Sequence, residues 1–101
     1  MIARRDLLER LDLFDEGFRL YYEEDDLCHR ARDVGMRVVN LPNVEVKHAW
    51  NKSIAQMDSA LRDALLQQSF YRYFTKRYGA PFGCLLRALR RSAGSLRGRL
   101  K

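Results

Sequence analysis

The sequence has few of the residues that mark special structural classes. Its 101 residues include only two cysteines, two prolines and six glycines. Two cysteines do not build a disulfide framework, and Cys28 and Cys84 lack the C-x-x-C spacing of a zinc knuckle. No apolar run approaches the roughly 18 residues that a membrane span needs. Collagen-like, low-complexity, disulfide-rich and membrane-spanning classes are therefore excluded, and one small globular domain, or a piece of a larger one, is expected.

The N-terminus also lacks an apolar stretch after its first arginines, so no secretory signal peptide is recognised. A cytoplasmic setting is therefore expected. The chain carries a net charge of +6, and the charge is unevenly distributed. Residues 1–26 hold four arginines against nine acids, whereas residues 84–101 hold six bases and no acid. The chain is thus acidic in its N-terminal part and basic in its C-terminal part.

Hydrophobic spacing predicts helices and two strands. Helices are expected over residues 5–13, from 23 to 34 with Gly35 as the stop, from the Ser53–Gln56 capping box to about 78, and over 82–92. The β-branched run 36–41 and the alternating run 44–48 predict strands. Two strands do not make an independently stable sheet, so an incomplete α/β fold is expected, which indicates that the chain belongs to something larger.

Four adjacent carboxylates, at positions 23–26, form the most informative stretch of the sequence. Acids at the first turn of a helix are favoured by the helix dipole, so a solvated helix start is one interpretation. However, four neighbouring carboxylates repel one another more than capping requires, and they directly follow Tyr21 and Tyr22. The other interpretation is therefore a cleft in which a carboxylate acts as general base or binds a metal or sugar hydroxyls.

His48 ends a predicted strand beside Trp50. A lone histidine often has a structural role, but an imidazole at a strand end can also complete a divalent metal site. Both interpretations remain open from the residues alone.

The ordered combination of these features resembles the C-terminal half of a family 2 glycosyltransferase, in the rhamnosyltransferase-like branch. The similarity runs through 14–18, 21–32, 35–39 and His48, and is close over residues 1–53. It implies a GT-A-type α/β fold with 1–53 as the acceptor-side catalytic portion, 54–92 as C-terminal helices and 93–101 as a basic tail. The implied activity is inverting transfer from a nucleotide-sugar donor to a cell-surface glycan or polyprenyl-linked acceptor.

The resemblance also implies roles for individual residues. Glu24 falls on the position of the general base, with Asp25 beside it as the alternative. Glu23, Asp26 and Trp50 would contact substrate, and His48 would help to hold a divalent cation, Mg or Mn. The donor-binding sheet and its Asp-x-Asp motif are not found here, so the chain resembles a truncated transferase, inactive in sugar transfer on its own.

The basic C-terminal part has three interpretations. The predicted helix 82–92 carries apolar residues on one face and Arg87, Arg90 and Arg91 on the other. Such a helix can lie at the inner face of an anionic membrane, and the segment can also be a solvated terminus. Nucleic-acid binding is disfavoured by the acidic first 26 residues, and no nucleic acid partner is expected. A non-catalytic membrane-surface or protein-interaction module is therefore the alternative to an enzyme fragment.

Overall fold

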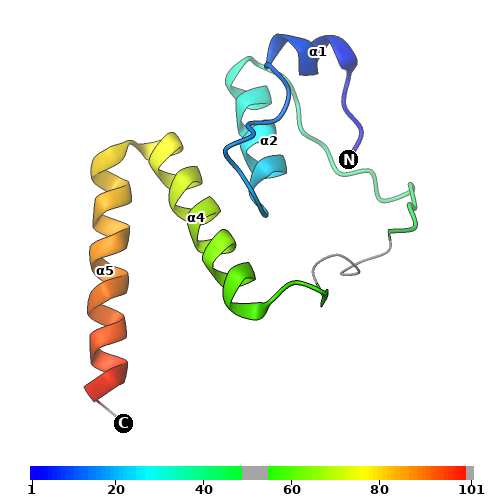
Figure 1. The fold of residues 1–101 in the computed structure, drawn as a ribbon. Coiled ribbons are helices and arrows are strands. Elements are labelled where there is room, and N and C mark those ends of the chain that lie inside the picture. The colour runs from blue at the N-terminus through cyan, green and yellow to red at the C-terminus, as the bar shows by residue number, and fades with distance from the viewer. Residues whose placement is uncertain (49–54, 100–101) are drawn as a thin grey trace.

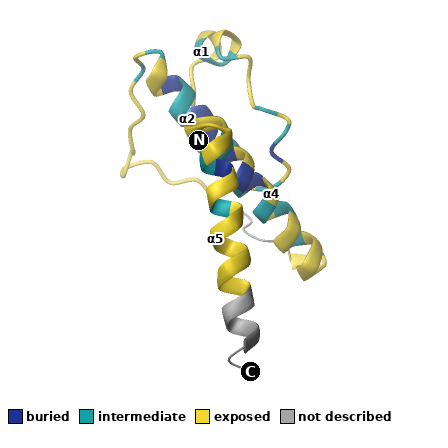
Figure 2. Ribbon diagram, turned by 90° about the vertical axis from the view of Figure 1, so that its left-hand side faces the viewer, coloured by how far each residue is buried: buried dark blue, intermediate teal, exposed yellow. Residues whose placement is uncertain are grey.

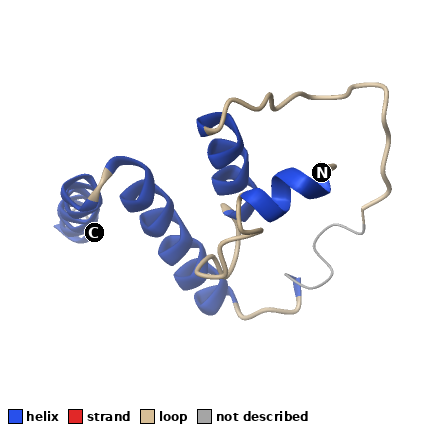
Figure 3. Ribbon diagram, turned by 90° about the horizontal axis from the view of Figure 1, so that it is seen from above, coloured by secondary structure: helices blue, strands red, loops and turns tan. Residues whose placement is uncertain are grey.

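The computed structural model describes residues 1–48 and 55–99, and the regular elements in these ranges are helices (Figure 1). They are α1 (Arg5–Arg10), α2 (Glu23–Asp33), α4 (Ser59–Tyr78) and α5 (Ala80–Arg99). In Figure 1, α4 and α5 form an inverted V, and Figures 1 and 3 show α2 on the side of α4 away from α5.

The predicted α/β class is wrong. Residues 36–41 and 44–48 were expected to be strands, but the structure gives them no regular secondary structure, and no strand occurs in 1–48 or 55–99 (Figure 3). The physical reason is that a strand is defined by a hydrogen-bonded neighbour, and these apolar runs have none beside them. Their side chains accordingly remain open to solvent, as with Val39 and Val46. Figure 2 shows most of the segment that follows α2 in the colour of exposed residues. An incomplete sheet of the GT-A type is therefore not present in the described residues.

The helix that was expected from 23 to 34 forms as α2, and local chemistry explains both of its ends. Its first turn holds four acids, which suit the positive end of the helix dipole. Beyond its last residues, Gly35 adopts a left-handed φ of 81°, and the Met36 amide donates to the Ala31 carbonyl at 3.0 Å. The prediction of this element and of its glycine stop is confirmed.

The two long helices differ in extent from the prediction. Asp58 caps α4 by accepting a hydrogen bond from the Leu61 amide at 3.0 Å, so α4 begins at Ser59, whereas the predicted start at Ser53 lies outside the described residues. Gly79 ends α4 as expected, with φ 92°. The next helix, α5, already begins at Ala80 and continues to Arg99, beyond the expected end near 92.

The core is small. Its buried apolar side chains are Phe18 in the loop before α2, Leu27 and Ala31 of α2, and Tyr71 and Tyr73 of α4. The radius of gyration is 17.0 Å, whereas a compact chain of this length has about 13 Å. The helices are therefore arranged openly, and contacts between charged side chains contribute much of what joins them.

One charged side chain holds the loop after α1. The Arg30 guanidinium of α2 donates to the carbonyl oxygens of Leu11 and Leu13, at 2.5 and 2.8 Å. Leu13 itself has a left-handed φ of 57°. These bonds fix the turn that leads from α1 toward Asp15.

None of the helices in the described ranges combines the length and the apolar character that crossing a bilayer would require.

Candidate functional site: the N-terminus of α2

The four predicted carboxylates lie together in the first turn of α2. The chain enters this turn through Tyr21 and Tyr22, whose φ angles of 61° and 69° are both left-handed. Such a conformation is unfavourable for a bulky residue and persists only where packing holds it. The Tyr22 ring supplies that packing, because its centroid lies 5.2 Å from that of Tyr73 and 6.2 Å from that of Phe70, both on α4. The start of α2 is thereby fixed against α4.

Asp26, which was expected to contact substrate, is directed into the protein. Its residue is 5% exposed, and its carboxylate accepts from Arg30 Nε at 2.8 Å. On the other oxygen, Oδ1, the Lys76 Nζ of α4 lies at 2.8 Å. Two cations therefore neutralise the buried carboxylate, as a buried charge requires.

Asp15 belongs to the same ion network. It accepts hydrogen bonds from Arg72 at 2.7 Å, from Lys76 at 2.8 Å and from the Gly17 amide at 2.9 Å. Burial disfavours the charged form of Asp15, but these three donors outweigh burial and hold its pKa well below the usual range. Lys76 thus bridges Asp15 and Asp26 and joins the loop, α2 and α4.

Glu24 and Asp25 are exposed, in contrast to Asp26. Glu23 is half-buried, and its Oε2 atom is buried without a hydrogen-bond partner among the described residues. The structure therefore separates the four acids into an inward residue, a half-buried one and two that solvent reaches. Only the last two can meet a large molecule without rearrangement.

A tyrosine and a histidine lie next to this turn. The Tyr73 hydroxyl hydrogen-bonds His29 Nδ1, and the two rings stack with centroids 5.5 Å apart. Burial raises the pKa of Tyr73, and the nearby charge of Asp25 raises it further. The raised pKa favours the protonated form of the Tyr73 hydroxyl, which can donate the hydrogen bond when His29 Nδ1 carries no proton.

His48 does not join the carboxylates. It is exposed, and its segment leaves the C-terminal end of α2, whereas the acids are at the N-terminal end (Figures 1 and 3). Trp50 lies outside the described residues. No group of three or more His, Cys, Asp or Glu side chains that could hold a metal occurs in the described ranges. A single exposed imidazole does not fit the oxygen-rich coordination of Mg or Mn.

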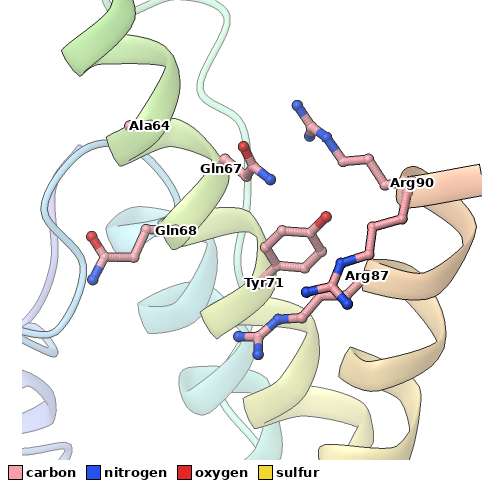
Figure 4. Close-up of a pocket in the computed structure, with 7 residues that line it drawn as sticks. Ala64, Gln67, Gln68, Tyr71, Arg87 and Arg90 are labelled. Carbon is pink, nitrogen blue, oxygen red and sulfur yellow. The ribbon is translucent and has the colours of Figure 1, made fainter. Parts of the chain in front are cut away.

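A second feature, between α4 and α5, was not predicted from the sequence. Arg87, Arg90 and Arg91 were expected on the helix face opposite the apolar residues, and they are exposed. They also line a cleft against Gln67 and Tyr71 of α4 (Figure 4). The stretch without acids at the C-terminal end was the signal present in the sequence. It could not reveal which helix the arginines would face.

Searches against protein-family models, curated proteins and solved structures found no match to this chain.

Proposed function

We propose that the chain carries the acceptor-side carboxylates of an inverting glycosyltransferase, with Glu24 as general base. The observation that supports this best is the separation of the four acids: Asp26 is neutralised inside, whereas Glu24 and Asp25 are open to solvent on a turn fixed against α4. A general base must reach the hydroxyl whose proton it removes, and an exposed carboxylate on a rigid helix start satisfies that geometry.

In this proposal Glu24 takes the proton of the acceptor hydroxyl while the hydroxyl oxygen attacks the anomeric carbon. The bond to the nucleotide leaving group breaks in the same displacement, so the configuration inverts and one base suffices. Binding of the nucleotide sugar belongs to residues outside this chain. Tyr22, packed on Tyr73, holds the turn so that Glu24 keeps its position.

A chimaera provides the test. The donor-binding half of a family 2 transferase is joined ahead of residue 1, and transfer from its nucleotide sugar to an octyl rhamnoside acceptor is measured. Glu24→Gln should lower turnover by about 10²–10⁴-fold and leave the KM of the donor almost unchanged. Glu9→Gln, an exposed acid of α1, is the matched control and should have no effect.

The outcome distinguishes three cases. If Asp25→Asn is the damaging change and Glu24→Gln is mild, the base is one residue further along the helix. If neither substitution alters the turnover of an active chimaera, the proposed function is wrong. The unmodified 101-residue chain should release no sugar from a nucleotide donor, and release would contradict the proposed need for a donor-binding part.

A second function, binding at an anionic membrane surface, is favoured by α5. Leu85 and Leu89 are 52% and 59% exposed, although burial of such side chains is normally favourable. A peripheral helix at a bilayer surface would cover them. Co-sedimentation with anionic vesicles tests this proposal, and binding should weaken as salt rises.

A further inference from the structure

The cleft between α4 and α5 is built around three arginines. It has a volume of about 570 Å³ and is lined by Gln67 and Tyr71 of α4 together with Arg87, Arg90 and Arg91 of α5. Figure 4 shows that the Gln67 amide and the Tyr71 ring point toward the same space as Arg90. The two helices enclose this space from opposite sides.

Local sequence explains why the cleft exists. Near the connection at Gly79, Gly83 of α5 meets Thr75 of α4 so closely that an added Cβ would lie 2.1 Å from Thr75 Oγ1. The helices therefore touch at their connected end. Farther along they diverge, as the inverted V in Figure 1 shows, and the arginines follow in the widening part.

The charges of the cleft are not balanced by acids. None of its lining residues is acidic, and no ion pair involves Arg87, Arg90 or Arg91 within the described ranges. Of the acids at and within α4, Asp58 caps the helix, and the exposed Asp63 lies 3.6 Å from Arg62 Nε. Three like charges in one cleft repel each other, and a bound anion would relieve that repulsion.

One arginine is also positioned by an aromatic ring. The Arg87 guanidinium carbon lies 5.2 Å from the centroid of the buried Tyr71 ring, which is the geometry of a cation–π contact. A guanidinium offers planar, bidentate hydrogen bonding that matches phosphate oxygens. Gln67 adds a neutral amide donor on the opposite wall.

We propose that this cleft binds a phosphate or diphosphate group. The group can be free in solution or carried by a lipid headgroup at a membrane, because both present the same oxygens to the arginines. The proposal does not depend on Glu24: the cleft lies on the face of α4 that carries Tyr71, whereas α2 packs on the face that carries Tyr73 and Lys76.

The first arm of the test uses inorganic pyrophosphate and the full chain. Amide NMR signals are followed during a titration at low and at physiological salt. Wild-type protein should bind saturably, with shifts at Gln67, Tyr71 and Arg87 and weaker affinity at higher salt. Arg87→Gln and Arg90→Gln should each weaken binding roughly tenfold, the effect of one lost charge-assisted hydrogen bond.

Arg10→Gln is the matched control, because it removes the same charge from exposed α1. It should bind pyrophosphate like the wild type. Circular dichroism confirms that each variant is folded. Absence of saturable binding by wild-type protein, or an equal loss in Arg10→Gln, would overturn the proposal.

The second arm identifies the source of the phosphate. Vesicles of phosphatidylcholine with and without phosphatidylglycerol are co-sedimented with wild-type, Arg90→Gln and Arg10→Gln protein. Selective loss in Arg90→Gln, with competition by pyrophosphate, supports a lipid headgroup in the cleft. Saturable pyrophosphate binding without vesicle binding supports a free phosphate group.

Discussion

The two faces of helix α4 differ in whether the basic side chains beside them are paired with carboxylates. On the face toward α2, Arg72, Lys76 and Arg77 each meet a carboxylate, on Asp15, Asp26 or Asp33. On the face toward α5, Arg87, Arg90 and Arg91 approach from the neighbouring helix and meet a tyrosine and glutamines instead. The first arrangement joins parts of the chain, whereas the second leaves cations available to a ligand. The net charge of the whole protein therefore says nothing about whether the charges on a given face are paired.

The largest loss of stability is expected from removing the Asp26 carboxylate, whose ion pairs lie on the face of α4 toward α2. Asp26→Ala removes the partner of Arg30 and Lys76 and should lower the free energy of unfolding by about 3 kcal/mol, as expected for a broken buried ion pair. Urea unfolding followed by circular dichroism measures the change. The control is Asp25→Ala, on the exposed neighbouring residue, which should change stability by less than about 0.5 kcal/mol. Equal losses in both variants would show that the Asp26 pairs do not hold α2 to α4.

A smaller loss of stability is expected from a substitution at Gly83, where α5 meets α4. Gly83→Ala places a methyl group against Thr75 Oγ1, which should force the helices apart and cost about 1–3 kcal/mol. Thr75→Ala in the same chain removes that oxygen and should restore much of the loss. Gly94→Ala is the control on the same helix, where an added Cβ meets nothing within 4 Å. Thermal melts of the four proteins are compared, and a neutral Gly83→Ala would contradict the close approach.

The smallest expected effect is a pH dependence of stability that arises from Asp15, on the face of α4 toward α2. The pKa of Asp15 is lowered in the folded protein, so its ion pairs stabilise the fold above the ordinary aspartate pKa of 3.8. This contribution is lost progressively as the pH falls below that value. It should amount to only about 1 kcal/mol, since Arg72 and Lys76 are partly exposed and screened by solvent.

Asp15→Asn should therefore lower the melting temperature at pH 7 and flatten its fall between pH 5 and pH 2. Asp12→Asn serves as the control, because Asp12 forms no ion pair within the described ranges and asparagine tolerates its left-handed φ of 59°. If the wild type and Asp15→Asn show parallel pH profiles, another acid is responsible for the dependence.

Sequence reasoning succeeded where local chemistry decides the structure. Four acids, an apolar period and Gly35 define α2, and Gly79 ends α4, without reference to distant residues. It failed for 36–48, because a β-branched run becomes a strand only when another strand lies beside it. The same dependence on distant partners explains why Asp26 could not be separated from Glu24 in advance. The i,i+4 spacing to Arg30 gave a hint, but the decisive partner, Lys76, lies 50 residues away.

The cleft escaped prediction for a related reason. Helical periodicity correctly separates Leu85 and Leu89 from the arginines of α5, but it does not say which face turns toward the rest of the protein. The usual expectation places apolar residues inside, and the structure instead leaves those leucines exposed. The close approach of Gly83 to Thr75 likewise depends on a side chain of another helix.

Only one residue connects the two long helices, so this residue is placed as a hinge for α5. Gly79 separates Tyr78 from Ala80, so a change in its backbone angles swings the whole of α5 about one point. At 1.5 Å per residue, Arg90 lies about 16 Å along the helix from that pivot, and a 10° rotation moves it by about 3 Å. Arg87, closer to the pivot, moves by only about 2 Å for the same rotation. Such a rotation would change the width of the cleft at its mouth more than at its closed end, where Gly83 meets Thr75.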